Sequence, residues 1–488
     1  MDFKQFKQLS KEYKSVPIYK RILADLLTPI SAYMRLTKGA EYSFILESVE
    51  QGEKYGRYSF IGRNPISVIK SENNKTYTYK NNSWIKKDQS FLSELRSLQE
   101  EYHSPKLSAV PSFSGGLVGF MGYESISWIE DIPIYDNDEL QCPDAIFMLF
   151  HDMIAFDHLK NEIILISNVK IKKNLDLVRA FESANKQIDK MGEDLHTDID
   201  YQTPTRVQKS ELKSNFSNKE FKNIVNRAKE HIDMGDIFQV VLSQRFTRKT
   251  SADPLTIYRA LRSVNPSPYM FHLNLAEFNI IGASPELLVK VEEDEIEIRP
   301  IAGTRQRGDS IDIDKKIAKD LLSDDKERSE HLMLVDLGRN DVGRSAEFNS
   351  VYVKEFMSIE YYSHVMHIVS DVRGKMKKNK DVLDALYSGF PAGTLTGAPK
   401  IRAMEIINDL EPNRRGVYSG AIGYFDFTGD MNTCIAIRTM VVKDGKVYFQ
   451  SGAGIVADSD PQKEYEETEN KAKAINNAID IAENGLIV

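Results

Sequence analysis

Paired strand-like segments with tight turns between them are the feature that most constrains the fold of this chain. Segments Cys434–Val442 and Lys446–Gln450 flank Asp444-Gly445, a dipeptide typical of the type I′ turn that joins two antiparallel strands. A second pair, at 280–292 and 295–301, has the same arrangement around an acidic turn. The chain is therefore expected to build antiparallel sheets from hairpins.

Helical segments separate these hairpins. Residues Lys219–Asp233 have the apolar spacing of an amphipathic helix and run through Gly235-Asp236 into a strand-like segment at Ile237–Phe246. Short alternating segments, such as Ile163–Val169, occupy the first part of the chain. Hairpins interleaved with helices predict an α+β fold with large, mostly antiparallel sheets.

A polar stretch without clear periodicity, at 191–216, interrupts this pattern. At 488 residues the chain is long enough for about three domains, or for one large sheet-based domain with a smaller one. We expect an N-terminal domain at 1–190, a linker at 191–216 and a C-terminal domain at 217–488.

Composition argues against several classes of function. The formal net charge of −8 argues against a broad nucleic-acid-binding surface, so a small anionic ligand would need its own cationic pocket. The two cysteines, Cys142 and Cys434, are far apart, which excludes a disulfide framework and a zinc ribbon. The N-terminus lacks the apolar segment of a signal peptide, and no run of about 18 apolar residues occurs. We expect a cytoplasmic protein that binds neither nucleic acid nor a membrane.

Two pairs of glutamates have the spacing that places them on one edge of a helix. Glu464 and Glu467 are three residues apart and follow the helix-start signal Asp460-Pro461, and Glu327 and Glu330 repeat the spacing elsewhere. Taken alone, either pair could be a solvated helix face. Like charges at this spacing repel each other, however, and beside an apolar stripe they favour a counter-ion. Oxygen ligands alone favour magnesium or calcium.

Three further features could receive an anion. The loop Phe390–Lys400 lacks the spacing of a P-loop, but its backbone N–H groups could bind a carboxylate, unless the loop only joins two helices. Gly452–Gly454 end a strand with an approachable backbone, or mark a bulge. Arg438 lies among apolar neighbours in the strand-like segment 434–442, so it needs a carboxylate partner in the protein or in a ligand.

Together these motifs resemble the chorismate-utilising enzymes, and within that family the branch that forms anthranilate. The resemblance implies the fold of that family, in which large, mostly antiparallel mixed sheets pack with helices and an N-terminal regulatory part is interleaved with the catalytic domain. It runs from Val16 to Ala474, and the matching motifs are Asp25–Tyr33, Phe44–Gly62, Gly235–Phe246, Ala283–Leu287, Arg299–Arg305, Ser329–Asp341, His364–Ile368, Phe390–Lys400, Gly420–Tyr424 and Gly452–Ala472.

The resemblance also implies how chorismate would be held. Glu330 and Glu467 match the direct ligands of a magnesium ion, which binds the ring carboxylate of chorismate, and Glu327 and Glu464 match residues that support the ion. The remaining chorismate-binding positions match Gly303, Thr304, Tyr418, Arg438, Gly452, Ala453 and Gly454.

Three residues match the catalytic positions of the family. Glu286 matches the general acid for the departing C4 hydroxyl, His367 matches a histidine near that group, and Thr394 matches a position that contacts the substrate. Hydroxide is a poor leaving group, so protonation by a placed carboxylic acid lowers the barrier, typically by about 10²–10⁴-fold in rate. Without the family context, His367 could be a core histidine and Glu286 an exposed acid at a turn.

Two positions separate the branches of the family. Ala302 stands where aminodeoxychorismate synthases usually carry a nucleophilic lysine, and Gln239 stands where isochorismate and salicylate synthases carry a basic lysine. The resemblance therefore implies that free ammonia adds to chorismate, giving anthranilate and pyruvate in the first step of tryptophan biosynthesis. The alternative is component I of an aminodeoxychorismate synthase of the folate pathway. The chain shows no glutaminase module, so a separate glutamine amidotransferase subunit, in a heterotetramer, is expected to supply the ammonia.

The N-terminal half matches the tryptophan-sensitive members of the family. Ser48 occupies the regulatory position, and Pro268, Tyr269 and Met270 match the segment that completes the inhibitor pocket. The side chains of Tyr269 and Met270 suit an indole ring, although aromatic clusters are more often plain core. Feedback inhibition by L-tryptophan is therefore expected.

Overall fold

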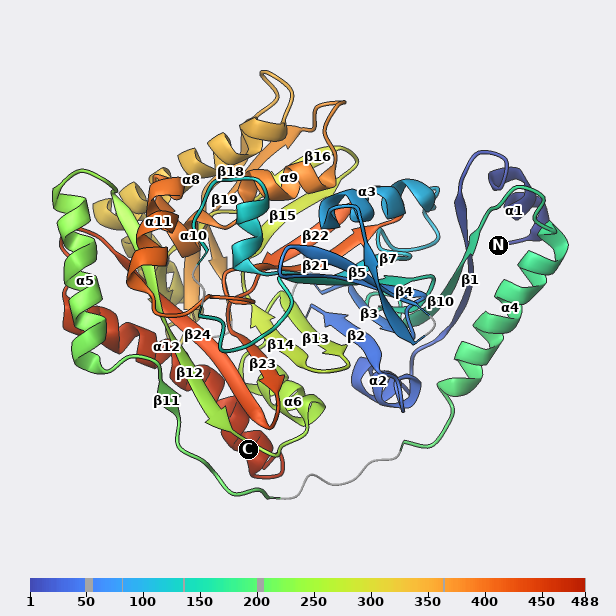
Figure 1. The fold of residues 1–488 in the computed structure, drawn as a ribbon, viewed down its shortest axis with the longest axis horizontal. Coiled ribbons are helices and arrows are strands. Elements are labelled where there is room, and N and C mark those ends of the chain that lie inside the picture. The colour runs from blue at the N-terminus through green and yellow to red at the C-terminus, as the bar shows by residue number, and fades with distance from the viewer. Residues whose placement is uncertain (49–55, 81, 135–136, 200–205, 363–364, 488) are drawn as a thin grey trace.

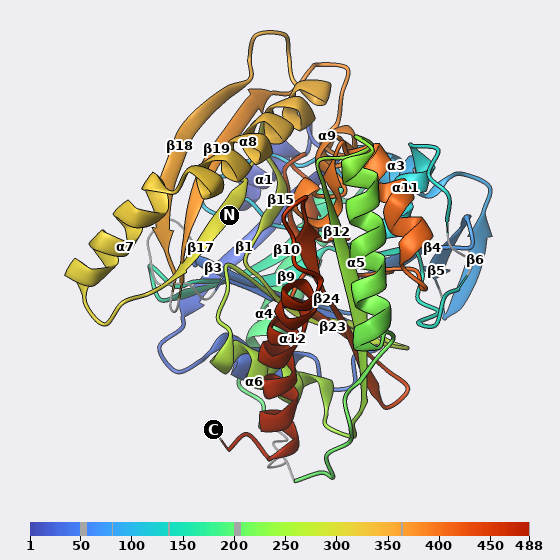
Figure 2. The same cartoon turned by 90° about the vertical axis from the view of Figure 1, so that its left-hand side faces the viewer.

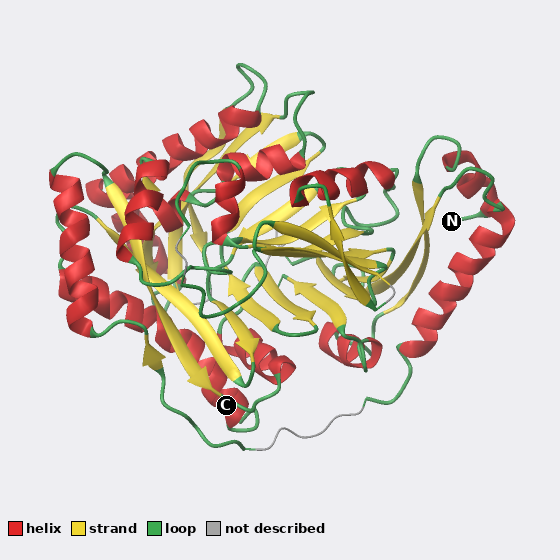
Figure 3. Cartoon of the chain, viewed as in Figure 1, coloured by secondary structure: helices red, strands yellow, loops and turns green. Residues whose placement is uncertain are grey.

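Two large sheets and the helices around them make up the computed structural model, which describes residues 1–48, 56–80, 82–134, 137–199, 206–362 and 365–487 (Figures 1 and 3). Within these ranges each sheet has twelve strands, and neighbouring strands in both run antiparallel. The α+β class with mostly antiparallel sheets, expected from the hairpin and helix signals, is confirmed.

The first sheet runs from N-terminal strands at one side to C-terminal strands at the other. The short strand β20 (Gly397–Ala398) pairs with β12 beside the main path. In spatial order the path is β1 (Ser15–Leu23), β10 (Glu162–Lys170), β9 (Asp152–Asp157), β3 (Tyr58–Arg63), β2 (Tyr42–Glu47), β13 (Tyr269–Leu275), β14 (Asn279–Ser284), β23 (Thr439–Lys443), β24 (Lys446–Ile455), β12 (Gln239–Lys249) and β11 (Lys213–Ser214).

The second sheet likewise has C-terminal strands at one side and N-terminal strands at the other. Strand β18 (Tyr352–Tyr361) pairs with β19 beside the main path. In spatial order the path is β17 (Ile301–Gln306), β19 (Val365–Lys375), β16 (Glu295–Ile298), β15 (Leu287–Glu292), β22 (Met431–Ile435), β21 (Ala421–Asp426), β7 (Gly116–Met121), β8 (Ala145–Phe150), β4 (Ser67–Glu72), β5 (Lys75–Lys80) and β6 (Ser83–Lys87).

Helices cover the outer faces of the two sheets. In Figure 2, α12 lies between α5 and α6, and it packs against both helices and against β24. The helices are α1 (Phe3–Leu9), α2 (Pro29–Leu36), α3 (Phe91–Glu101), α4 (Leu177–Asp194), α5 (Asn218–Asp233), α6 (Pro254–Val264), α7 (Ile311–Ser323), α8 (Asp325–Ser345), α9 (Val382–Gly389), α10 (Gly393–Thr396), α11 (Lys400–Leu410) and α12 (Pro461–Glu483), with a 3₁₀ helix, η1, at Tyr123–Trp128.

Three main apolar clusters hold these layers together. One lies between the sheets and combines residues such as Phe44 and Phe271 of the first sheet with Phe120 and Ile422 of the second. Another packs the first sheet against α2, α4, α6 and α12, and the third packs the second sheet against α3, α8 and α9. Burial of this apolar surface is the main force that orders the layers.

Both sheets contain strands from both halves of the chain. The halves meet where β2 pairs with β13 in the first sheet and where β7 pairs with β21 in the second. This interleaving was expected from the family resemblance. The division into domains at 1–190 and 217–488 stays a prediction. Of the expected linker, 200–205 lies outside the described residues, and the rest includes the end of α4 and strand β11.

Two segments expected to be single strands each break and change sheet. The segment 280–292 is β14 of the first sheet followed by β15 of the second, with Pro285-Glu286 between them. The segment 434–442 is β22 followed by β23, and the chain crosses back at Ala436–Arg438. Proline cannot donate a ladder hydrogen bond, and Arg438 has a φ of 49°, so neither strand can continue. Because apolar and polar residues alternate with the same period in the strands of both sheets, this pattern in the sequence cannot reveal where the chain crosses from one sheet to the other.

Both glutamate-bearing helices are present, and α12 begins where the predicted signal at Asp460-Pro461 places it. Asp460 caps α12, accepting hydrogen bonds from the backbone N–H groups of Gln462 at 3.0 Å and Lys463 at 2.9 Å. Asp324 caps α8 in the same way. No helix among the described residues has the length and apolar character needed to span a membrane.

Candidate active site

A cavity of about 840 Å³ lies where the chain crosses between the two sheets, and we call it the central cavity. Helices α8 and α12 contribute to its wall, as do β12, β17, β19 and β24. It brings together most of the residues expected from the sequence, namely Glu286, Thr304, Glu330, His367, Thr394, Tyr418, Arg438, Gly452, Gly454, Glu464 and Glu467. Gly303, Ala453 and Glu327 lie next to lining residues in the chain but do not line it.

Glu286 stands at the first crossing, where it meets helix α10. The hydroxyl of Thr394 donates a hydrogen bond to Oε1 of Glu286 at 2.8 Å. Burial raises the pKa of Glu286 to about 7, against the opposing effects of the Thr394 hydrogen bond and of the charges of Arg438 and Lys471. A carboxyl group with this pKa is protonated in a large fraction of molecules near neutral pH, as a general acid requires.

Arg438 stands at the second crossing rather than inside a strand, so the predicted strand position is wrong. Its guanidinium is part of the cavity wall, and its Nη1 donates a hydrogen bond to Oδ1 of Asn265 at 3.4 Å. Its charge lowers the pKa of Glu286, which shows that the two groups are close enough to interact. A cation in this position can receive a substrate carboxylate.

The glycines of β24 keep the cavity open beside Tyr418. They are paired regularly with β12, Gly452 with Ser243 and Gly454 with Val241, so they do not mark a bulge. A Cβ on Gly452 would lie 2.8 Å from the carbonyl oxygen of Leu242 and 2.9 Å from the hydroxyl of Tyr418. The missing side chain therefore lets a ligand approach the backbone of β24 next to that hydroxyl.

The two predicted acidic edges face the same cavity. Glu330 of α8 and Glu464 and Glu467 of α12 all line it. Burial raises the pKa of Glu330, and the charges of Glu327 and Glu467 raise it further. Burial likewise raises the pKa of Glu464, with a contribution from Glu467. Each of these carboxylates makes ionisation of its neighbours less favourable. A hard divalent cation bound between them would remove this repulsion.

The carboxylates are not gathered into a closed metal site in this structure. Within the described residues, no group of three or more metal-binding side chains is close enough to hold an ion. Glu467 is paired with Lys471 at 2.7 Å, and Glu327 accepts a hydrogen bond from Arg305 at 2.7 Å. The donor set fits magnesium by its chemistry, while its present ion pairs would have to open for the ion to bind.

His367 lies on β19 with its ring held by β17. Its Nδ1 lies 3.1 Å from the carbonyl oxygen of Gly303 and 3.0 Å from the hydroxyl of Thr304. A carbonyl oxygen can only accept, so Nδ1 carries the proton. Burial lowers the pKa of His367, against the opposing effect of the hydrogen bond with Gly303, so the ring is neutral. A neutral ring with Nδ1 protonated has Nε2 as its proton acceptor.

The two positions that separate the branches of the family both belong to this cavity. Ala302 and Gln239 are among its lining residues. Neither side chain carries a titratable amine. The lysines that line the cavity are at other positions in the sequence. Two of them form ion pairs, Lys326 with Asp458 at 2.9 Å and Lys471 with Glu467.

The residues expected to bind tryptophan lie outside the central cavity. Ser48 follows β2, and Met270 lies on β13, the neighbouring strand, directly opposite Glu47. Met270 is buried, and the hydroxyl of Ser48 is buried without a hydrogen-bond partner among the described residues. Pro268 and Tyr269 directly follow Ser267, which does line the cavity. Residues 49–55, next to Ser48, are outside the described part of the chain.

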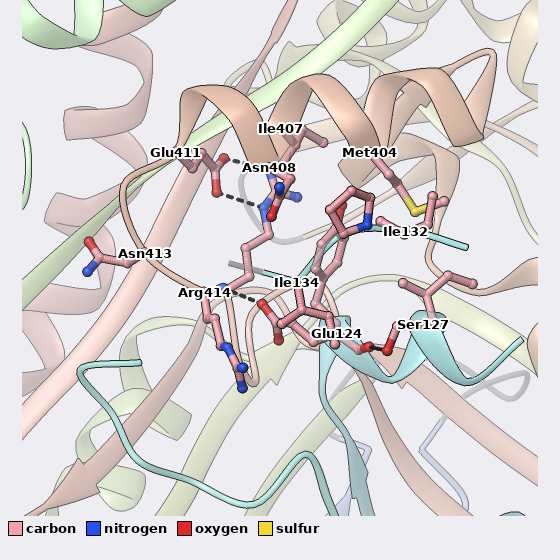
Figure 4. A pocket seen from close by; sticks show the side chains of 14 residues that line it. Glu124, Ser127, Ile132, Ile134, Met404, Ile407, Asn408, Glu411, Asn413 and Arg414 are labelled. Atoms are coloured by element: carbon pink, nitrogen blue, oxygen red, sulfur yellow. Dashed lines mark hydrogen bonds and ion pairs between the residues drawn. The ribbon is translucent and has the colours of Figure 1, made fainter. Parts of the chain in front are cut away.

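A buried ion pair that no local sequence signal indicates supports the cavity wall. Arg415 donates hydrogen bonds to both carboxylate oxygens of Glu411, and also to the carbonyl oxygens of Leu395 and Val241, at 2.6 to 2.9 Å. Leu395 and Val241 both line the cavity. The pocket in Figure 4, of about 30 Å³ and lined by Glu411 and Glu124, lies beside this pair and is too small for a metabolite.

The fold and this site define an enzyme whose candidate active site lies at the junction of two antiparallel sheets. The sequence profile of the chorismate binding enzymes matches residues 41–477, and the chain belongs to this family. Within it, the chain is 45% identical to anthranilate synthase component 1 of Acetivibrio thermocellus, over 98% of both chains. It is 44% identical to anthranilate synthase component 1 of Aquifex aeolicus, over 99% of this chain and 98% of that one. The resemblance to the anthranilate-forming branch is confirmed.

Solved structures agree with this placement. Anthranilate synthase component I from Streptococcus pneumoniae superposes with a TM-score of 0.78 at 39% identity, covering 93% of this chain and 99% of that chain. The menaquinone-specific isochorismate synthase from Escherichia coli superposes with a TM-score of 0.70 at 17% identity, covering 98% of both chains. The second likeness concerns the fold alone, so the fold does not distinguish the branches.

Proposed function

We propose that this protein converts chorismate and ammonia to anthranilate, pyruvate and water, the first step of tryptophan biosynthesis. The observation that carries the proposal is the pairing of Glu286 with Thr394 beside Arg438, in a cavity where positions 302 and 239 hold no lysine. Curated relatives named anthranilate synthase component 1 match nearly the whole chain, which makes the aminodeoxychorismate synthase alternative less favourable.

The first step joins ammonia to the ring and removes the C4 hydroxyl. Ammonia forms a bond to C2, the ring double bonds shift, and the C4–O bond breaks. The departing hydroxide takes a proton from Glu286 and leaves as water, and the new ammonium group releases one proton to solvent. Glu286 contributes because a protonated carboxyl turns a poor leaving group into a good one. Arg438 and Tyr418 hold the enolpyruvyl carboxylate during this step.

The second step makes the ring aromatic. A base removes the proton from C2, the bond between C3 and the enolpyruvyl oxygen breaks, and the enolpyruvyl group takes up a proton to become pyruvate. His367 is suited to accept a proton in this cavity because its ring is neutral and its Nδ1–H is held by the Gly303 carbonyl. The gain of aromaticity drives the elimination.

Magnesium is the ion that suits the acidic wall. Glu330 and Glu467 would hold it directly, and Glu464 stands on the same wall to support it. When bound, the ion neutralises the ring carboxylate and withdraws electron density from the ring. Glu327 could support the ion once it leaves Arg305. Isothermal titration with magnesium should give a heat of binding that is lost in Glu330→Gln.

Ammonia is proposed to come from a glutamine amidotransferase subunit. The relatives are named component 1, which supports a second component. The proposed complex is a cytoplasmic heterotetramer of the two subunits. The chain alone should then use ammonium salts but not glutamine, and efficient use of glutamine by a homogeneous sample would contradict this.

L-Tryptophan is proposed as the feedback inhibitor, held by Ser48, Pro268, Tyr269 and Met270. The hydroxyl of Ser48 is buried and has no hydrogen-bond partner among the described residues, which supports a polar ligand there. Coupling to the active site requires that tryptophan favour a state that binds chorismate poorly. Chorismate saturation curves with and without tryptophan test this inhibition, and identical curves would contradict the proposal.

The decisive experiment mixes the purified protein with chorismate, magnesium and ammonium chloride. Formation of anthranilate, followed by its fluorescence, together with an equal amount of pyruvate is the expected result. Accumulation of a non-aromatic amino-chorismate would instead indicate the folate-pathway reaction. No consumption of chorismate would contradict both.

A further inference from the structure

A second, smaller pocket lies against Glu286, and we call it the side pocket. Its volume is about 40 Å³. It shares Glu286, Thr394 and Leu334 with the central cavity, so these three side chains stand between the two spaces. Its wall also includes Ile298, Pro300, Leu337, Gly338, Asp341 and Gly393.

The side pocket has the size of a short water channel. At roughly 10–15 Å³ for each water molecule, it has room for about three of them, and none for chorismate. Leu334 and Leu337 of α8 form part of its wall, and the partly exposed residues Leu337 and Gly393 lie at its rim. Asp341, which pairs with Lys400 at 2.8 Å, adds a polar group.

The proposed reaction requires Glu286 to regain a proton after every turnover. Glu286 gives its proton to the departing hydroxide, and bound substrate or product then covers it on the side of the central cavity. The ammonium group formed at C2 releases one proton to solvent, so one proton must return from solvent to Glu286 for the cycle to balance. Glu286 and Thr394 are the polar groups that connect the central cavity with the side pocket.

We propose that the side pocket holds a chain of water molecules that returns this proton from solvent to Glu286. Hydronium on the solvent side becomes water as the proton moves along the chain, and the carboxylate of Glu286 becomes the carboxylic acid. No bond to the substrate forms or breaks in this step. The inference rests on the proposed function, because it is the removal of the C4 hydroxyl that consumes the proton.

Filling the pocket with a side chain tests the proposal. Gly338 lines the pocket, and a Cβ there would lie 3.3 Å from Cγ of Pro300, 3.6 Å from Cγ2 of Val372 and 3.9 Å from Cγ2 of Ile298, so the side chain of Gly338→Val would crowd the pocket beside Pro300 and Ile298. Gly343→Val is the matched control, because it lies on the same helix and its Cβ would meet nothing within 4 Å. Leu337→Phe, at the rim, is a second filling variant should Gly338→Val not fold.

The readouts are kcat, the KM values for chorismate and for ammonium, and the ratio of kcat in H₂O to that in D₂O. We expect Gly338→Val and Leu337→Phe to lower kcat about tenfold and to raise the solvent isotope ratio, because proton transfer becomes limiting. Both KM values and all properties of Gly343→Val should stay at the wild-type level.

Three results would overturn the proposal. A rise in the KM for ammonium alone would make the pocket an entrance for ammonia. A lower kcat with an unchanged isotope ratio would indicate a structural effect, and wild-type kinetics in a folded filling variant would show that protons arrive by another route. A wild-type enzyme that formed no anthranilate would instead refute the proposed function itself, before any variant is compared.

Discussion

At the scale of single residues, Glu286 shows how position alone changes a side chain's chemistry. It follows Pro285 at the point where the chain leaves one sheet for the other, and burial there raises its pKa to about 7. The sequence could identify Glu286 only through its resemblance to a family. Its protonation could not be predicted, because the surrounding groups come from α10, the second crossing and α12, far apart in the chain.

Glu286→Gln should remove the proton donor while keeping the shape of the side chain. We expect kcat for anthranilate formation to fall by about 10²–10⁴-fold, with the KM for chorismate nearly unchanged, because the proton is needed in the transition state. Steady-state kinetics with ammonium in excess measure both constants. A variant that keeps more than half of the wild-type kcat would show that another group protonates the leaving hydroxyl.

The pH dependence of the wild-type enzyme should report the same carboxyl group. Since the pKa of Glu286 is about 7, its acid form is depleted as pH rises above that value, and kcat should fall in proportion. The Thr394 hydroxyl donates to the carboxylate and so lowers this pKa. Thr394→Val should therefore move the alkaline limb to higher pH. Profiles recorded at constant free ammonia test this, and a limb that moved to lower pH would contradict the assignment.

At the scale of secondary-structure elements, local signals and long-range contacts differ in what they reveal. Helices α5 and α12 begin near their predicted positions because capping and apolar spacing are encoded within a few residues. The breaks in the segments 280–292 and 434–442 escaped prediction, because the second sheet continues the same alternation as the first. The site lies at those breaks, so the least predictable part of the fold carries the chemistry.

The Arg415–Glu411 ion pair fastens several elements around the site. The two side chains are 1% and 4% exposed, and the guanidinium also binds backbone carbonyls of β12 and α10. Arg415→Met should lower the free energy of unfolding by about 3–5 kcal/mol, because it leaves the Glu411 charge buried without its partner. Urea unfolding monitored by circular dichroism measures the change.

A surface pair provides the control for this prediction. Arg339 and Asp336 form an ion pair at 2.8 Å, but their side chains are 57% and 60% exposed. Arg339→Met should change stability by no more than about 1 kcal/mol, because water and salt screen such pairs. Combining Arg415→Met with Glu411→Leu should recover part of the loss, since both buried charges are then gone. Equal losses in the free energy of unfolding for Arg415→Met and Arg339→Met would mean that the buried pair stabilises the fold no more than the surface pair does.

At the scale of the whole molecule, the two halves of the sequence do not form separate sheets. The apolar cluster between the sheets takes residues from both halves, for example Phe44 and Phe120 from the first and Phe271 and Ile422 from the second. The polar stretch at 191–216 therefore does not separate two apolar cores, and the domain boundary placed there stays a prediction. Pairing between strands so distant in the chain has no local signal, which is why composition and periodicity could not predict it.

The C-terminal half alone, residues 217–488, should therefore not fold to a native state. Removing the N-terminal strands would expose the edge of β13 in the first sheet and the edge of β21 in the second, together with the apolar faces between them. Exposed strand edges and apolar surface of this kind favour aggregation.

We expect the fragment to lack near-ultraviolet circular dichroism and to be digested rapidly by trypsin. The full chain should unfold in a single transition, whether unfolding is followed by near-ultraviolet circular dichroism or by susceptibility to trypsin. A soluble, protease-resistant fragment that bound chorismate, or two separate transitions in the full chain, would show that the shared sheets are less tightly coupled than their pairing implies.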